Sequence, residues 1–259
     1  MILSDLATYL EALGYRLSTH EEIASTNDEA IARARAGDPG RLWIVARSQT
    51  KGRGRNGRSW TSQPGNLFAS LLLIDPVPLA RAPELGFVTS LAGACALQGL
   101  VGDNARIGVK WPNDLYCGGA KLAGVLLESA TLEGGAAALV AGIGVNCASH
   151  PTDTLYPATD LAAILGRPVA AEDAFSALAR EMARWAGVWT QPGGFSAIRR
   201  EWLARAIGIG ERIRVARRGG DVEGVFSTID ESGRLALNAG GPGEVRIDAG
   251  DVFLSGAAR

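Results

Sequence analysis

The sequence predicts an α+β fold in which a large domain of strands and helices is followed by a small domain of short strands. Up to about residue 206, segments with apolar residues at helical spacing alternate with short apolar runs. From residue 207, five short apolar runs are separated by glycine turns, which is typical of a small β-barrel or sandwich. With 259 residues, 47% of them hydrophobic, the chain can bury a full core. We expect domains of residues 1–206 and 207–259.

The N-terminal segment is expected to form a helix and then a strand. Leucines recur at helical spacing from Leu3 to Leu13, where Ser4 can cap the helix and Gly14 can end it. The strand is expected from Arg16 to Ile23.

A second helix is expected directly after this strand. Ser25 and Thr26 are both suitable N-caps, and Glu29, three residues after Thr26, completes a capping-box pattern. The helix should continue to about Gly37.

The remaining elements follow from apolar runs and turn residues. The strands expected in the large domain are Leu42–Ala46, Leu67–Ile74, Ala105–Lys110, Lys121–Ser129 and Ala136–Val145, the last two joined by a hairpin at Gly134-Gly135. The helices expected there are Glu84–Leu100 and, within the helical stretch Pro157–Leu203, an amphipathic run beginning near Ala171. The short C-terminal strands expected are Arg212–Val215, Val222–Ile229, Arg234–Leu237, Val245–Ile247 and Val252–Leu254.

The composition argues against several functional classes. Lys and Arg total 26 against 27 for Asp and Glu, so no overall field attracts nucleic acid or an anionic membrane. No basic stretch precedes an apolar core at the N-terminus, and no apolar run reaches transmembrane length, so neither signal peptide nor membrane span is expected. The three cysteines form no C-x-x-C pair. We therefore expect a reduced, cytoplasmic protein.

Lysine is unusually rare in this chain. Only Lys51, Lys110 and Lys121 are lysines, and all other basic residues are arginines. Such a chain should keep lysine where a compact ammonium is needed, and all three lie in the two segments described next. Chance in a small sample and a genome-wide preference for arginine are the alternative explanations.

The segment Gln49–Trp60 is the most informative part of the sequence. Between Lys51 and Arg58 it has four positive charges and no acid, interleaved with glycines. Glycine lets backbone amides approach an anion, and arginine supplies paired donors for carboxylate or phosphate oxygens. We predict that this loop wraps an anionic ligand and becomes ordered on binding it. A solvated basic loop is the alternative.

Common nucleotide-binding motifs do not explain this loop. Gly52, Gly54 and Gly57 match G-x-G-x-x-G, but the turn residues 62–65 prevent the helix that a dinucleotide fold requires. The chain contains neither His-Arg-Asp nor Asp-Phe-Gly, which argues against a protein kinase. Residues 118–122 lack the spacing of a Walker A loop.

A second group of candidates follows in the next strands. Lys110 and Trp111 end a strand, and Asn113 and Asp114 follow in a predicted turn. Lys121 opens an apolar run, so burial should require an anionic partner for its ammonium. Gly124 would let a ligand approach the backbone, and the amide of Asn146 could bind a purine edge. Each of these could also be ordinary structure.

Taken together, these motifs resemble those of the bacterial biotin protein ligases, in the monofunctional form without a DNA-binding domain. The segments that carry the resemblance are Ser25–Asn27, Gly52–Trp60, Lys110–Asp114, Lys121–Gly124 and Gly142–Asn146. They occur in the family's order, and the resemblance extends from Leu17 to the C-terminus. It implies a mixed sheet with helices on one face, as in class II aminoacyl-tRNA synthetases and lipoate ligases, followed by an SH3-like barrel.

The resemblance also implies an activity. A carbon–nitrogen ligase of this kind forms biotinyl-5'-AMP from biotin and ATP with Mg²⁺, and transfers biotin to one lysine of a biotin carboxyl carrier protein. The alternatives are a lipoate or octanoate ligase, which is not expected to have the repeated Gly-Arg loop, and a nucleic-acid-binding regulator that responds to biotin. About twenty residues precede the first motif strand, too few for a helix-turn-helix domain, so we expect no nucleic-acid partner. A homodimer through the central sheet is compatible with the family.

Residue roles follow from the resemblance, motif by motif. The residues expected at the biotin ureido ring are Ser25, Thr26, Asn27 and Gln49. The catalytic residues, expected at the biotin carboxylate and the ATP phosphates, are Arg53, Arg55 and Lys121, with Gly52, Gly54 and Gly124 leaving room for ligand. The residues expected at the nucleotide are Arg58, Trp60, Lys110, Asn113 and Asn146, and Asp114 would hold Mg²⁺ or orient its neighbours. The reaction needs no protein nucleophile, which fits His20 and His150 lying outside every motif.

Overall fold

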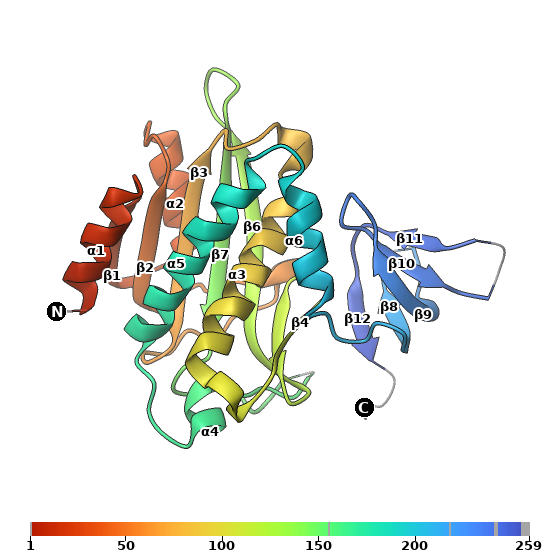
Figure 1. Ribbon diagram of the computed structural model, residues 1–259. Coiled ribbons are helices and arrows are strands. Elements are labelled where there is room, and N and C mark those ends of the chain that lie inside the picture. Colours follow the sequence, from red (N-terminus) through yellow and green to blue (C-terminus); the bar gives the residue numbers. More distant parts are fainter. Residues whose placement is uncertain (1, 155, 218, 241–242, 255–259) are drawn as a thin grey trace.

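The computed structural model describes residues 2–154, 156–217, 219–240 and 243–254 (Figure 1). The large domain is built on a seven-stranded sheet in the order β1-β2-β3-β7-β6-β5-β4. Only β1 and β2 pair in parallel, and every other neighbouring pair is antiparallel, which confirms the predicted mixed sheet. The strands are β1 (Arg16–Ile23), β2 (Leu42–Gln49), β3 (Leu67–Ile74), β4 (Ile107–Lys110), β5 (Asp114–Cys117), β6 (Ala120–Thr131) and β7 (Ala137–Val145).

Most of the helices cover one face of this sheet. They are α1 (Ile2–Ala12), α3 (Glu84–Val101), α5 (Ala171–Trp189) and α6 (Gly194–Leu203), and the short α4 (Leu161–Leu165) follows β7 (Figure 1). Their apolar side chains join alternate residues of the strands in one large core, where Trp43 and Phe175 meet edge to face with ring centroids 5.4 Å apart.

Helix α2 (Thr26–Arg35) packs on the opposite face, so the expectation of helices on one face only is wrong for this helix. Ala30 and Ala34 bury their methyl groups against Leu72 of β3 and Val140 of β7. These strand residues point away from the large core because successive side chains of a strand alternate between faces. The N-terminus of α2 therefore lies over the middle of the sheet.

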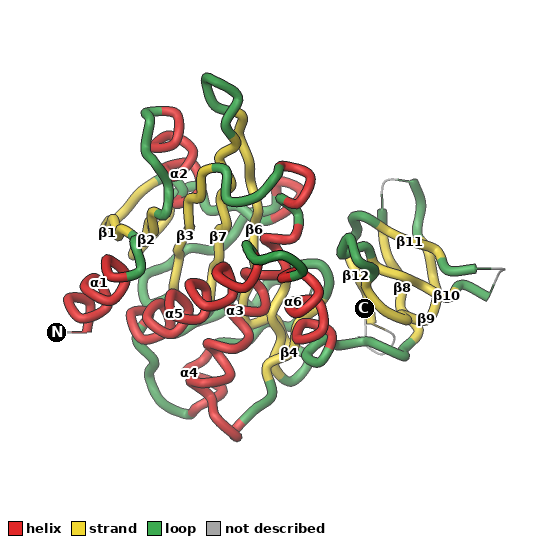
Figure 2. The backbone as a smooth tube through the Cα atoms, turned by 45° about the horizontal axis from the view of Figure 1, so that its top comes forward, coloured by secondary structure: helices red, strands yellow, loops and turns green. Residues whose placement is uncertain are grey.

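The C-terminal domain is a separate antiparallel sheet in the order β11-β10-β9-β8-β12, in agreement with the expected SH3-like architecture. Its strands are β8 (Arg212–Ala216), β9 (Val222–Ile229), β10 (Leu235–Asn238), β11 (Val245–Ile247) and β12 (Asp251–Leu254). Figure 2 shows this sheet beside α6 and β4. Trp111 fixes the contact, since its buried indole Nε1 donates a hydrogen bond of 3.1 Å to the carbonyl of Gly233.

Of the two residues expected to cap α2, Ser25 is confirmed as the N-cap, and its hydroxyl accepts from the amide of Asp28. The capping box expected for Thr26 and the cap expected for α1 are wrong. Glu29 does not complete a capping box but pairs with Arg33 at 2.7 Å. Helix α1 already begins at Ile2, so Ser4 lies within it, although Gly14, with a φ of 75°, ends the turn after the helix as expected.

The strand β5 was not predicted, because Asn113 and Asp114 are typical turn residues. Asn113 does lie in the turn, whereas Asp114 starts the strand. The expectation that no apolar run reaches transmembrane length also needs correction. Residues 84–104, which include α3, are long and apolar enough, with a mean hydropathy of 1.5, but 72% of that stretch is buried inside the fold. Helix α3 is therefore the central helix of the core.

Candidate active site

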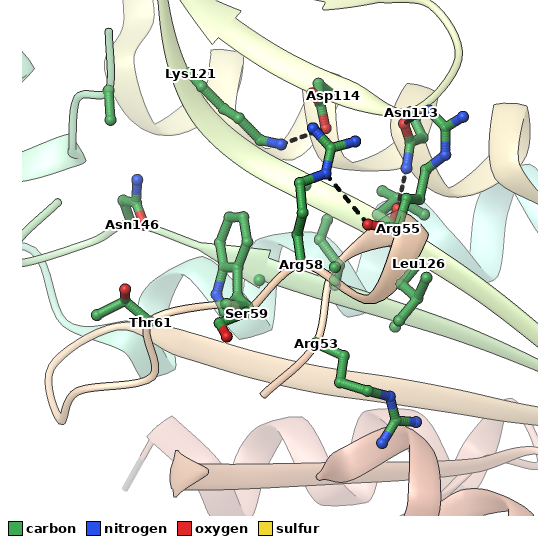
Figure 3. Close-up of a pocket in the computed structure, with 18 of the residues that line it drawn as sticks. Arg53, Arg55, Arg58, Ser59, Thr61, Asn113, Asp114, Lys121, Leu126 and Asn146 are labelled. Atoms are coloured by element: carbon green, nitrogen blue, oxygen red, sulfur yellow. Dashed lines mark hydrogen bonds and ion pairs between the residues drawn. The ribbon is translucent and has the colours of Figure 1, made fainter. Parts of the chain in front are cut away.

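One cavity of about 470 Å³ opens on the face of the sheet that carries α2 (Figure 3). That volume suits a ligand of the size of a nucleotide or a cofactor. Of the candidates from the sequence, those that line the cavity are Ser25, Thr26, Asn27, Gln49, Arg53, Gly54, Arg55, Arg58, Trp60, Lys110, Asn113, Asp114, Lys121, Gly124 and Asn146. Gly52 is the exception. It lies at the base of the loop, where its carbonyl accepts from the amide of Trp60.

Glycines of β6 and β7 make room for Trp60. Gly124 and Gly144 face each other in the strand register. A Cβ atom on Gly124 would lie 3.1 Å from the Trp60 ring, and one on Gly144 would lie 2.5 Å from its Nε1. The indole thus packs directly on the backbone of the sheet, and the Lys121 ammonium lies 5.5 Å from its ring centroid. Any larger residue at either glycine would displace the ring.

The start of α2 forms an uncharged, buried end of the cavity. Gln49 Oε1 accepts from the backbone amide of Thr26 at 2.8 Å and lies 3.2 Å from its hydroxyl. Ser70 of β3, which the sequence did not single out, lies within 2.7 Å of the Thr26 hydroxyl and 2.6 Å of Asn27 Oδ1. These neutral donors and acceptors suit a polar, uncharged ring.

Arg53 is held by two carboxylates at the edge of this end. Its guanidinium makes two bonds of 2.6 and 2.7 Å to Asp28, and lies 3.1 Å from Glu128 Oε1. The bond to Arg53 holds the pKa of the Asp28 carboxyl below its usual range. In Figure 3 the Arg53 side chain points away from Lys121 and Asn113. The loop itself contains no acidic residue between Lys51 and Arg58, so the carboxylates that neutralise Arg53 come from α2 and β6.

Arg55 and Arg58 instead reach the C-terminal domain. Arg58 makes two bonds to the carboxylate of Asp251, at 2.9 and 3.0 Å, and Arg55 donates to the carbonyl of Gly250 at 3.1 Å. Arg55 also donates to Asn113 Oδ1 at 3.1 Å. The sequence analysis missed Asp251, because no local signal connects it with an arginine that is 193 residues away.

Lys121 has the anionic partner expected from its position. Its ammonium lies 2.7 Å from Asp114 Oδ1, and about a quarter of each side chain is exposed. Asp114 is paired with Gly124 in the register of β5 and β6. The ion pair therefore lies at the glycine opening, where Trp60 packs.

Lys110 is the most deeply buried cation of the site. Its ammonium donates to the hydroxyl of Tyr116 at 3.1 Å and lies 4.3 Å from the ring centroid of Tyr156. Burial lowers the pKa of Lys110 to about 8. Tyr156, also absent from the sequence-based candidates, contacts Phe253 of β12 with ring centroids 5.5 Å apart. The C-terminal domain thus contacts the side of the cavity formed by Lys110 and Tyr156, in addition to Arg55 and Arg58.

The amide of Asn146 is partly engaged by the protein. Its Nδ2 donates to the carbonyl of Thr159 at 3.0 Å, which fixes the orientation of the carboxamide at the cavity wall. Its backbone amide donates to the carbonyl of Leu122 at 3.0 Å.

Neither histidine lines this cavity. His150 pairs with Asp160 at 2.6 Å, and His20 lies within 3.0 Å of the Ser18 hydroxyl. Within the described part of the chain, no group of three or more His, Cys, Asp or Glu side chains could hold a metal ion by itself. The described residues of the site offer cations and hydrogen-bonding groups to a ligand.

Comparisons with known proteins agree with this arrangement. Residues 21–146 match the biotin/lipoate A/B protein ligase family, and residues 208–255 match the biotin protein ligase C-terminal domain. The chain is 40% identical over 238 residues to the biotin–[acetyl-CoA-carboxylase] ligase of Paracoccus denitrificans, covering 90% of this chain and 98% of that protein. It is 35% identical over 248 residues to the ligase of the same name from Mycobacterium tuberculosis, covering 92% and 89%. The biotin protein ligase of Aquifex aeolicus in complex with biotin and ATP superposes with a TM-score of 0.79 at 25% identity, covering 92% of this chain and 99% of that one.

Proposed function

Since the chain belongs to the biotin/lipoate A/B protein ligase family, we propose that it forms biotinyl-5'-AMP from biotin and ATP and transfers biotin to a carrier-protein lysine. The observation that carries this proposal is the division of one cavity into two ends. The α2 end presents buried neutral groups, and the other end presents Arg55, Arg58, Lys110 and Lys121. A ligand with a neutral polar ring and a carboxylate, placed beside a polyphosphate, matches both ends.

The cations would serve the first step. A carboxylate and a phosphate repel each other, so attack on the α-phosphorus requires positive groups that offset both charges and hold them in line. Lys121 and Arg55 would do this. Among the described residues, Lys121 pairs with Asp114, while the hydrogen bonds of Arg55 go to neutral oxygens and the Asp251 carboxylate lies 3.9 Å from its guanidinium. The assignment of Arg53 to the ligand stays a prediction, since its guanidinium is occupied by Asp28 and Glu128.

The second step needs no protein nucleophile. The neutral amine of the acceptor lysine attacks the carbonyl of the mixed anhydride and forms the C–N bond of an amide. The acyl C–O bond breaks, AMP leaves with its electron pair, and the surplus proton of the amine passes to water. The role of the protein is to hold the anhydride and exclude water until the carrier arrives.

Mg²⁺ fits this site as a partner of ATP. The cation usually binds through substrate phosphates, water and one or two carboxylates, so it needs no dedicated cluster of protein ligands. Asp114, Asp153 and Asp251 are the carboxylates among the described residues that line the cavity, and Asp114 and Asp251 lie beside Lys121 and Arg58. When bound, Mg²⁺ would offset phosphate charge, and Asp114 would either hold the ion or orient Lys121.

The relatives' names point to acetyl-CoA carboxylase as the source of the acceptor domain. We propose action in the cytoplasm, where the three free thiols, Cys95, Cys117 and Cys147, would stay reduced. Homodimer formation through the central sheet is part of the same proposal, and sedimentation with and without ligands measures it.

Calorimetry with biotin and with lipoate, each with and without ATP, tests the function. We expect biotin to bind alone and far more tightly than lipoate, and biotin with ATP to release pyrophosphate and label a purified carrier domain. Tighter binding of lipoate or octanoate would favour the lipoate-ligase alternative. A gel shift at moderate salt that depends on biotin and ATP would favour the regulator.

A further inference from the structure

Glu128 of β6 contacts both the uncharged end of the cavity and the loop Gln49–Trp60 without belonging to the motifs that identified the site. Its Oε2 accepts from Asn27 Nδ2 at 2.7 Å, and its Oε1 lies 3.1 Å from Arg53 Nη2. Asn27 is at the uncharged end of the cavity, and Arg53 is the first arginine of the loop. One carboxylate therefore joins the group that meets the ring to the loop that covers the ligand.

This carboxylate also orients the Asn27 amide, together with the carbonyl of Leu126, which accepts a longer bond of 3.3 Å from the same Nδ2. An ionised carboxylate only accepts hydrogen bonds, so Asn27 must present its NH₂ group to Glu128. The carbonyl oxygen of Asn27 is then directed to the Ser70 hydroxyl at 2.6 Å. Gly142 of β7 leaves the space for this carboxamide, since a Cβ atom there would overlap it. With the amide reversed, its carbonyl oxygen would face the Glu128 carboxylate, so that two acceptors would meet without a donor, and its NH₂ group would face the Ser70 hydroxyl.

A chain of hydrogen-bonding groups leads from Asn27 to Trp60, at the far end of the loop. From Asn27, hydrogen-bonding atoms follow one another through Ser70, Thr26, Gln49 and Ser62 to the carbonyl of Trp60, with separations of 2.6 to 3.2 Å. Arg53 and Trp60, the two ends of the cationic loop, are thus connected across the base of the uncharged end. Glu128 is the charged group that links Asn27 to Arg53 at the start of this chain of hydrogen bonds.

We propose that Glu128 is a positioning residue that fixes the Asn27 amide for ring recognition and at the same time anchors Arg53, so that ligand recognition and loop closure depend on the same carboxylate. This inference rests on the proposed function, because the ring is that of biotin. Glu128 touches neither reacting group, and its effect passes through Asn27 and Arg53.

Glu128→Gln is the main test, because glutamine keeps the shape but must present an NH₂ group to one of the two donors. We expect the Kd for biotin, measured by calorimetry without ATP, to rise about tenfold or more. Tryptic cleavage at Arg53, Arg55 and Arg58 should also become several times faster. The thermal midpoint should change little, since the side chain is a third exposed.

Three further variants separate the two effects. Asp28→Asn removes the paired bonds to Arg53 and leaves Asn27 untouched, so it should speed loop cleavage at an unchanged Kd for biotin. Ser70→Ala removes the partner of the Asn27 carbonyl, so it should raise the Kd with little change in cleavage. Glu29→Gln removes a negative charge from α2 at a residue that pairs with Arg33 and does not line the cavity, so it should change neither the Kd nor the cleavage rate.

The outcomes separate this inference from the proposed function. If the wild-type protein binds no biotin, the proposed function fails. If the wild-type protein binds biotin and Glu128→Gln keeps both its Kd and its cleavage rate, the positioning role of Glu128 is overturned. If Glu128→Gln does not fold, Glu128→Asp, which retains the charge but withdraws it by one methylene, should show both losses, and wild-type values for Glu128→Asp would equally overturn the proposal.

Discussion

Trp60 packs on Gly144 so closely that one added methyl group on this glycine would lie 2.5 Å from the indole Nε1. Gly144→Ala should therefore displace the indole and with it the loop end that covers the cavity. We expect adenylate formation, followed by pyrophosphate release, to fall about tenfold or more, because a displaced loop no longer holds the reactants in line. A methyl group on Gly187 of α5 would meet no atom within 4 Å, so Gly187→Ala is a matched control. It should keep full activity and gain about 0.5–1 kcal/mol of stability. Equal activity of the two variants would show that the position of Trp60 is unimportant.

Lys121→Ala should lower adenylate formation by about two to three powers of ten, because it removes charge stabilisation that develops in the transition state. Pyrophosphate release from saturating biotin and ATP measures this. Lys121→Arg should not restore the rate, since the planar guanidinium is bulkier than the ammonium that lies 2.7 Å from Asp114 beside Gly124. A near wild-type rate in the alanine variant would remove Lys121 from the mechanism.

The sequence predicted the large domain well wherever the pattern was local and strong. Leu67–Ile74 forms a strand buried on both sides, and its position at the centre of the sheet follows from its continuous apolar run. The four-residue strand β5 was missed because it is short and begins with Asp114. The location of α2 on the opposite face could not be predicted either, since the alanines that bury it are too small to mark an apolar stripe.

Most site candidates could be named from the sequence, but not their partners. The charge and the glycines of the loop Gln49–Trp60 marked it as a binding element. Fifteen candidates from this loop and the other motifs line the cavity. Nothing local indicated that Asp28 and Glu128 hold Arg53, or that Asp251 holds Arg58. Those pairs depend on how distant strands are placed, which residue spacing does not encode.

Biotin with ATP should protect the loop Arg53–Arg58 from trypsin, because bound anions order the arginines. In the protein without ligands, Asp251 holds Arg58. Asp251→Asn should therefore increase cleavage after Arg58 several-fold without ligand, while biotin and ATP should restore protection. Mass spectrometry of the first fragments gives the cleavage site. Identical cleavage of wild type and variant would show that the contact with β12 does not restrain the loop, and cleavage unaffected by ligands would show that ordering is not coupled to binding.

Nucleotide affinity should fall as the pH rises from about 7 to 9. Burial lowers the pKa of Lys110 to about 8, so its ammonium is charged below that pH and neutral above it. The groups around it, Tyr116, Tyr156, Asp114, Lys121, Asp251 and Arg58, do not supply a direct ion pair within the described part of the chain. Calorimetry with ATP across this range, in the absence of biotin, measures the effect. Lys110→Arg, which stays charged, should flatten the profile, and an unchanged slope in this variant would assign the pH dependence to another group.

The involvement of β12 in the cavity bears on how the protein becomes active during synthesis. Gly250 and Asp251 are translated after the whole of the large domain, yet they complete the wall that holds Arg55 and Arg58. A nascent chain still on the ribosome can fold its seven-stranded sheet before this wall exists. Such a chain would release any activated vitamin it made into solvent, so full retention has to wait until β12 has been translated and has folded.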